Sequence, residues 1–141
     1  MNYFLDTSAL IKNYIEESGS DYITQLLDQA SNIYVSELTI IECYSTLRRI
    51  LLEKLISKNE YIYLKQEIYY DFEYFHKVEY SAGLPYCEII IDTYQLKTLD
   101  SIQLAASLCV KDEINAFVCS DNKLLKAAKE ENLEIINPVS I

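Results

Sequence analysis

The sequence predicts a single α/β domain in which a central, mostly parallel β-sheet is flanked by α-helices. Short apolar segments that suit buried strands alternate with helical patterns along the chain, and this alternation is typical of parallel sheets. A length of 141 residues fits one domain, residues 1–141, with one core. Two apolar segments, 2–5 and 116–119, are each followed within two residues by an aspartate.

In the first half of the chain, hydrophobic spacing places each element. Residues 2–5 form a strand and residues 8–15 a helix, with Thr7 or Ser8 suited to cap it. A second helix follows residues 18–20, and residues 33–35 form a buried strand. A long helix should run from Ser36 as its cap to about Ile56, because apolar residues recur there at helical spacing: Ile40, Tyr44, Leu47, Leu51 and Leu55.

The second half repeats this alternation. Another helix is expected over residues 59–77. We interpret His76 in this segment as a structural residue. Residues 81–85 should end that helix, and the type of segment 88–94 stays open. A helix rich in small residues opens at 99–106, with four side chains facing inward: Ile102, Ala105, Ala106 and Cys109. Residues 116–119 suit a buried strand, 123–131 a helix and 133–136 a last strand.

Composition narrows the classes of function. The formal charge is −10, from 12 basic and 22 acidic side chains, and such a field repels polyanions. Composition alone therefore favours a basic partner or cations over nucleic acid. The cysteines show no CxxC spacing and read as buried reduced thiols, which argues against zinc: Cys43, Cys87, Cys109 and Cys119. The first residues predict no leader and no membrane span, hence a cytoplasmic protein.

Four acidic residues are candidates for one site. Right-handed crossovers between parallel strands put Asp6 and Asp121 at the same edge of the sheet, where ligands bind in such folds. Asp100 lies in the first turn of its helix and Glu42 near the apolar stripe of another, and both can reach that edge. Taken alone, Asp100 also suits a plain N-terminal helix acid, and Glu42 a glutamate at the rim of the core.

Carboxylates that meet at one place need a cation. A pair about 4 Å apart repels by roughly 4 kcal/mol at an effective dielectric constant of about 20. Such a cluster stays ionised only beside a cation, and otherwise one acid takes up a proton. An all-oxygen ligand set favours Mg²⁺ or Mn²⁺ over zinc. A carboxylate metal site of this kind suits phosphodiester hydrolysis.

Four segments resemble the PIN domain family, in particular the VapC-type toxin ribonucleases of bacterial and archaeal toxin–antitoxin pairs. They are YFLDTSALIK at 3–12, VSELTIIE at 35–42, LKTLDSIQLA at 96–105 and VCSDNKL at 118–124. They come in the family's order, and the similarity extends from residue 2 to about residue 138. The resemblance implies a Mg²⁺-dependent endoribonuclease with a catalytic, metal-binding quartet, namely Asp6, Glu42, Asp100 and Asp121.

The resemblance also implies supporting hydroxyls on Thr7, Ser8 and Ser120, which would orient the carboxylates or hold a water. Glu37 competes with Glu42 for the second acidic place, and the family pattern favours Glu42. Many relatives carry histidine where this chain has Gln103, and residues 78–91 match the family poorly.

Partners follow from the same resemblance. An RNA substrate would need basic side chains to hold its phosphates, and each candidate also reads as an ordinary solvated residue: Lys12, Arg48, Arg49 and Lys97. The resemblance implies a cognate antitoxin, and a homodimer is expected. The tyrosines from Tyr61 to Tyr86 suit an interface as well as they suit core filling.

Three other functions compete with the nuclease. A PIN-like module with idle or structural acids agrees with the net charge of −10. A phosphatase with an aspartyl nucleophile usually needs a second acid two residues after the first, where this chain has Ser8. A receiver domain needs an acid pair ahead of its phosphoacceptor strand, and the sequence lacks one.

Overall fold

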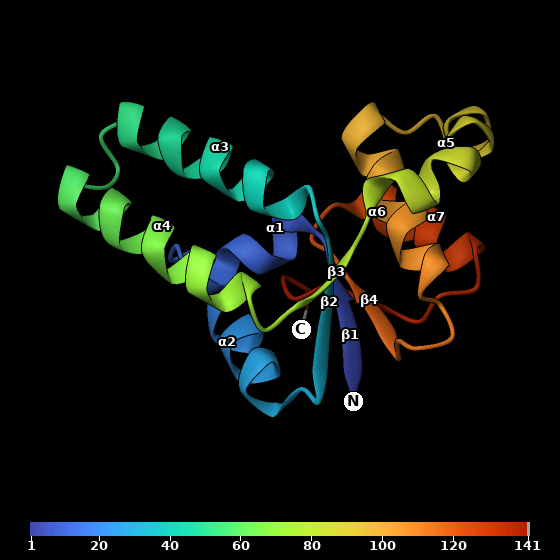
Figure 1. Cartoon of the computed structure of the whole chain (residues 1–141), viewed down its shortest axis with the longest axis horizontal. Coiled ribbons are helices and arrows are strands. Elements are labelled where there is room, and N and C mark those ends of the chain that lie inside the picture. The colour runs from blue at the N-terminus through green and yellow to red at the C-terminus, as the bar shows by residue number, and fades with distance from the viewer. Residues whose placement is uncertain (141) are drawn as a thin grey trace.

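The computed structural model describes residues 1–140, which form an α/β domain around a parallel β-sheet (Figure 1). The five strands within these residues are β1 (Asn2–Leu5), β2 (Asn32–Ser36), β3 (His76–Val78), β4 (Ala116–Val118) and β5 (Ile135–Ile136). Their spatial order is β3-β2-β1-β4-β5, and every neighbouring pair is parallel. The predicted fold class is confirmed.

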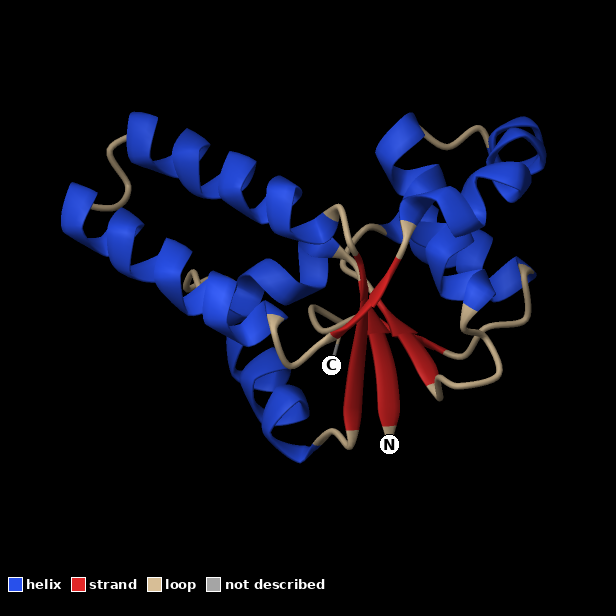
Figure 2. Cartoon of the chain, viewed as in Figure 1, coloured by secondary structure: helices blue, strands red, loops and turns tan. Residues whose placement is uncertain are grey.

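Helices cover both faces of this sheet (Figure 2). One side carries α1 (Thr7–Leu10), a 3₁₀ turn η1 (Ile11–Asn13), α2 (Ser20–Gln29), α3 (Thr39–Leu52) and α4 (Lys58–Phe72). The other side carries α5 (Tyr80–Tyr94), α6 (Thr98–Cys109) and α7 (Asn122–Glu130). The helices α3 and α4 form a hairpin that extends away from the sheet (Figure 1). Within residues 1–140, no helix is both long and apolar enough to span a bilayer.

Successive residues of the central strands face two different cores. Phe4 and Phe117 are stacked with ring centroids 5.7 Å apart and belong to the core under α5, α6 and α7. Leu5 and Val118 belong to the core under α1 to α4. A parallel sheet between two helical layers is buried on both faces, so its strands are continuously apolar. This burial explains why the strands could be located from short apolar segments.

Helix α3 is shorter than predicted at both ends. Ser36 is the last residue of β2, and its hydroxyl accepts a hydrogen bond from the Leu38 backbone at 3.2 Å, before the helix begins. At the other end, Lys54 adopts a positive φ of 61°, and Leu55 is 70% exposed instead of lying in the core stripe. The buried residues of α3's apolar face are Cys43, Leu47 and Ile50.

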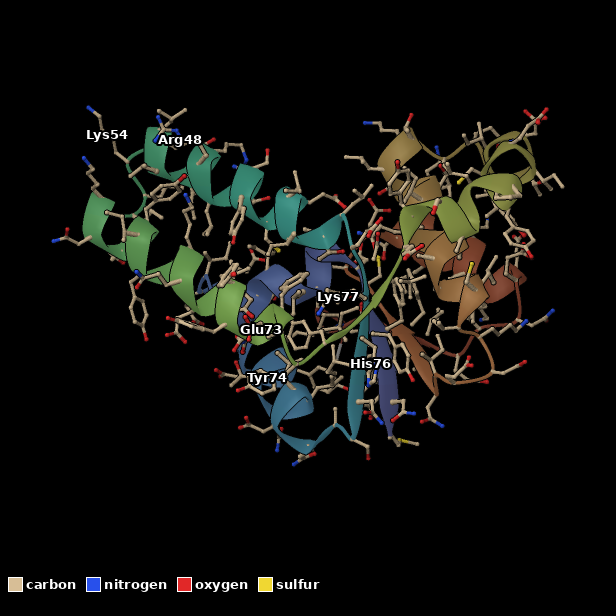
Figure 3. The ribbon with its side chains drawn as sticks, in the orientation of Figure 1. Arg48, Lys54, Glu73, Tyr74, His76 and Lys77 are labelled. Atoms are coloured by element: carbon tan, nitrogen blue, oxygen red, sulfur yellow. The ribbon has the colours of Figure 1, made fainter. Side chains whose placement is uncertain are left out.

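Residues 76–78 form the edge strand β3, where the sequence predicted the end of a helix. His76 pairs in register with Tyr34 of β2, and its ring stacks on the Tyr34 ring with centroids 4.7 Å apart. Figure 3 labels His76 and Lys77 on this strand. Pairing with β2 stabilises so short a strand, and such a distant partner leaves no trace in local periodicity.

Residues 80–94 form helix α5, although the sequence predicted a break at 81–85 and left 88–94 open. Gly83 is buried where α5 meets α6, and a Cβ atom added to it would lie 2.9 Å from Cβ of Ala105. The glycine therefore permits a close approach between two helices and does not mark a turn. Packing against α6 outweighs the local signals of Gly83 and Pro85.

Three of the four cysteines match the prediction of buried free thiols: Cys43, Cys87 and Cys119. Cys109 is free but exposed, which corrects its predicted inward orientation. It is the last residue of α6, where the helix has left the core. The helix predicted over residues 8–15 is the four-residue α1 followed by the 3₁₀ turn η1, and the remaining predicted elements are present with small shifts of their ends.

Candidate metal centre

The first acidic residue caps the helix that follows it. Asp6 is 4% exposed, and its Oδ1 accepts hydrogen bonds from the Ala9 backbone at 3.2 Å and from the Ser8 hydroxyl at 2.8 Å. The cap of α1 is thus Asp6, not Thr7 or Ser8 as predicted. Burial is the largest cause that raises the pKa of Asp6 to about 7, and the charge of Asp100 adds to it.

A second junction lies directly beside the first. The Asp6 backbone N–H donates to the Val118 carbonyl at 3.1 Å, and the Ser120 backbone N–H donates to the Ser8 hydroxyl at 3.0 Å. Asp121 caps α7 by accepting a hydrogen bond from the Leu124 backbone at 2.9 Å. The carboxyl ends of β1 and β4 therefore meet at one edge of the sheet, as the crossover argument predicted.

Asp100 links the other three acids electrostatically. It lies in the first turn of α6, and its pKa is raised by burial and then by the charge of Asp121. The pKa of Glu42 is raised by burial, and Asp100 again contributes. The charge of Asp100 thus raises the pKa of Asp6 and of Glu42, and the charge of Asp121 raises that of Asp100. Carboxylates that repel one another in this way are groups that a divalent cation would stabilise.

Glu42, and not Glu37, faces this group. The Oε1 atom of Glu42 accepts a hydrogen bond from Nε2 of Gln103 on α6 at 2.8 Å. The Oε1 atom of Glu37 instead accepts one from the Tyr80 backbone at 3.0 Å, at the start of α5. Family resemblance favoured Glu42 over Glu37, and the different hydrogen-bond partners of the two glutamates agree with that preference.

The donor chemistry fits Mg²⁺ or Mn²⁺, because all four acids offer hard oxygen ligands. Within residues 1–140, no three His, Cys, Asp or Glu side chains lie close enough to form a complete ligand group. Asp6 and Asp121 each direct one carboxylate oxygen at their own helix. The Ser120 hydroxyl is buried without a hydrogen-bond partner among these residues, and such an atom suits a supporting ligand.

The predicted RNA-binding residues separate into two groups. Lys12 is buried with its Nζ 2.8 Å from Oε1 of Glu17, and Arg49 pairs with Glu53 at 3.3 Å on α3. Arg48 lies towards the outer end of the α3–α4 hairpin, away from the sheet (Figure 3). Lys97 is the one of the four candidates with an electrostatic effect on a site carboxylate. Burial raises the pKa of Asp100, and the charge of Lys97 partly offsets that rise.

Lys123 is a basic residue that the sequence reasoning missed. Its charge also opposes the rise in the pKa of Asp100, and its Nζ donates to the Gln95 carbonyl at 2.7 Å. Its position two residues after Asp121 was the available signal, because the first turn of that helix lies at the same sheet edge. Lys97 and Lys123 are therefore the two cations whose charges lower the pKa of Asp100.

The fold and these residues define an α/β protein with a candidate oxygen-ligand metal centre at the carboxyl edge of a parallel sheet. The chain belongs to the PIN domain family, whose model matches residues 3–136. No curated protein sequence matches the chain.

Several solved structures share the fold. PAE2754 from Pyrobaculum aerophilum superposes with a TM-score of 0.71 at 16% identity, covering 99% of this chain and 90% of that one. A toxin–antitoxin complex from Klebsiella pneumoniae gives 0.68 at 14% identity, with 96% and 97% covered. FitAcB from Neisseria gonorrhoeae gives 0.67 at 13% identity, with 99% of each chain covered. At these identities the likeness shows the fold alone.

Proposed function

We propose that this protein is a Mg²⁺- or Mn²⁺-dependent endoribonuclease and the toxin of a toxin–antitoxin pair, acting in the cytoplasm. Membership of the PIN domain family supports a nuclease. The observation that carries the proposal is the set of hydrogen bonds that brings the acid-bearing segments together: Ser8 joins Asp6 to Ser120, next to Asp121, and Gln103 joins Glu42 to Thr7. The charge of Asp100, which raises the pKa of Asp6 and of Glu42, agrees with this geometry.

Each acid has a role in this proposal. Asp6, Glu42, Asp100 and Asp121 would hold the cation, which when bound activates water and offsets charge on the phosphodiester. Ser8 holds the Asp6 carboxylate in place through its 2.8 Å hydrogen bond. Glu42 would complete the ligand set or accept a proton, and Thr7 and Ser120 would supply supporting hydroxyls.

RNA would be held by the cations beside Asp100. The charges of Lys97 and Lys123 lower the pKa of Asp100, and we infer that these two lysines contact the backbone phosphates of the RNA. Their local charge is needed because the formal charge of −10 repels RNA at long range.

Substitution of the acids tests the activity. A defined RNA panel is incubated with parent, Asp6→Asn and Asp100→Asn in Mg²⁺ and in EDTA, and the ends of the products are mapped. The cleavage rate of each variant should fall more than the roughly 10- to 100-fold that is typical when a residue supporting a metal ligand is replaced. Asp92→Asn, which removes an exposed acid on α5, should cleave like the parent. Cleavage by Asp6→Asn at the parent's rate would contradict the proposal.

A groove beside the α3–α4 hairpin supports an antitoxin partner. It has a volume of about 710 Å³, and its lining combines apolar side chains with glutamates: Tyr14, Ile15, Glu16, Glu17, Arg49, Ile50, Leu55, Ile56, Glu60, Tyr63 and Leu64. Such a lining fits a segment that carries both apolar and basic side chains. The neighbouring structures from Klebsiella pneumoniae and Rickettsia felis are themselves complexes of this class, a toxin–antitoxin complex and VapBC2.

The tyrosines add to this support. Most of those between residues 61 and 86 are exposed, which favours an interface over core filling: Tyr63, Tyr69, Tyr70, Tyr74, Tyr80 and Tyr86. Co-purification with the product of the adjacent gene should be lost in Leu55→Asp and kept in Leu52→Asp, an exposed leucine outside the groove. Light scattering of the chain alone tests the alternative occupant, a second copy in a homodimer.

The net charge of −10 favours one other candidate, a PIN-like module whose acids bind a metal or a protein without turnover. Calorimetric titration with Mg²⁺ alongside the cleavage assay separates the two. Metal binding without cleavage of any RNA in the panel would support the idle module.

A further inference from the structure

We propose that Gln103 is a positioning residue that holds the Glu42 carboxylate towards Asp100; this rests on the proposed function. Gln103 is 2% exposed and lies on α6, three residues after Asp100. Its Nε2 atom is within hydrogen-bond distance of three oxygens, namely Glu42 Oε1 at 2.8 Å, Thr39 Oγ1 at 2.9 Å and Thr7 Oγ1 at 3.2 Å.

The carboxylate determines the orientation of this amide. An NH₂ group has two hydrogens, so three acceptors compete for them. Each threonine hydroxyl can donate to the amide oxygen or accept from the amide NH₂ group, so it is compatible with either orientation of the amide. An ionised carboxylate can only accept a hydrogen bond and therefore requires the NH₂ group. The Nε2 end of Gln103 therefore faces Glu42, at the shortest of the three distances.

The other end of the amide has no partner of its own among the described residues. Oε1 of Gln103 is buried and accepts no hydrogen bond within residues 1–140. An unpartnered buried oxygen costs folding free energy, and a methionine of similar length would avoid that cost. The hydrogen bond from its Nε2 atom to the Glu42 carboxylate explains a buried glutamine at this position.

The contacts of Gln103 join three elements of the candidate centre. Thr7 follows Asp6 at the start of α1, Thr39 begins α3 one turn before Glu42, and Gln103 shares the N-terminal half of α6 with Asp100. One side chain thus fixes the position of Glu42 relative to both Asp6 and Asp100. Residues that orient metal ligands in this way tune metal affinity without touching the metal.

Calorimetric Mg²⁺ titration of full-length Gln103→Met, Glu42→Gln and the double variant tests this role, with kcat and KM on a cleavable RNA. Gln103→Met should bind Mg²⁺ about 10- to 100-fold more weakly, with kcat reduced and KM unchanged. The double variant should bind no more weakly than Glu42→Gln alone, because the two residues act as a unit. Ser107→Ala, a buried polar residue on the same helix, should bind like the parent.

Parent-like Mg²⁺ affinity in Gln103→Met, or independent losses that multiply in the double variant, would overturn the positioning role. Gln103→Leu, which removes the donor without adding a charge, gives the same test should Gln103→Met not fold. A parent that neither binds Mg²⁺ nor cleaves RNA refutes the proposed function itself. A parent that does both, with Gln103→Met unchanged, refutes only the role of Gln103.

Discussion

The Ser8 hydroxyl accepts a hydrogen bond from the backbone nitrogen of Ser120 at 3.0 Å and donates one to Oδ1 of Asp6 at 2.8 Å. A single side chain therefore joins the β1–α1 junction to the β4–α7 junction. These junctions carry Asp6 and Asp121, which are far apart in sequence, so the Ser8–Ser120 contact fixes part of the geometry of the candidate centre.

Removal of this hydroxyl should be costly. Ser8→Ala leaves the Ser120 N–H without its acceptor, and we expect the free energy of unfolding to fall by about 1–2 kcal/mol. Urea unfolding of the metal-free protein measures the change. Ser18→Ala, which alters an exposed serine, should unfold like the parent. Equal midpoints for Ser8→Ala and the parent would show that the contact does not hold the junctions together.

The burial of Asp6 predicts a pH dependence. The pKa of Asp6 is raised from 3.8 to about 7 in the folded protein, so the folded state binds the proton more tightly than the unfolded state. The contribution of protonated Asp6 to the free energy of unfolding is fully present below about pH 4 and is lost as the pH rises through about 7. The total loss is about 4 kcal/mol. Without metal, Asp6→Asn should therefore be more stable than the parent at pH 8, by much more than at pH 4.

Thermal melting at these two pH values in EDTA checks the prediction. Asp21→Asn, which neutralises an exposed acid on α2, should shift the melting temperature little at either pH. A gain for Asp6→Asn that is the same at pH 4 and pH 8 would argue that burial does not raise the pKa of this carboxyl.

Gly83 gives a packing test. Gly83→Ala places a Cβ atom 2.9 Å from Cβ of Ala105; this overlap should cost about 1–3 kcal/mol against a gain of about 1 kcal/mol in helix propensity. We expect a net loss of stability in urea unfolding. The exchange variant Gly83→Ala with Ala105→Gly removes the contact between the two Cβ atoms but leaves the added Cβ 3.1 Å from the Ala105 backbone carbon and 3.2 Å from the Ala106 backbone nitrogen. It should therefore recover only part of the loss. A stabilised Gly83→Ala would mean that α5 and α6 can move apart freely.

The two lysines beside Asp100 should contribute to RNA binding where Arg48 does not. In an Asp6→Asn background, Lys97→Ala and Lys123→Ala should each weaken RNA binding and reduce the salt slope by about 1, as expected for a lost phosphate contact. Arg48→Ala is the matched control, because that side chain lies towards the outer end of the hairpin (Figure 3). Fluorescence anisotropy across a salt series measures both quantities, and equal effects of all three substitutions would contradict this assignment.

Local sequence failed at particular places for identifiable reasons. The strand at His76 exists because Tyr34 lies beside it, and α5 continues through Gly83 because α6 packs against that position. Leu55 has the right helical spacing for the core stripe but follows the end of α3 and is exposed. In the first two cases, contacts with residues distant in the chain outweighed local pattern. In the third, the chain turns locally at Lys54, whose φ is 61°.

The sequence by itself determined the α/β class, the two central strands and the aspartates that follow them, because double-sided burial and helix capping are imposed by neighbouring residues. The tertiary structure alone decided that Glu42 accepts a hydrogen bond from Gln103 of α6 whereas Glu37 accepts one from Tyr80. It also decided that the charge of Lys123 acts with that of Lys97 on the pKa of Asp100. These outcomes depend on how each helix crosses the sheet and which of its faces reaches the edge, and packing across the whole chain sets both.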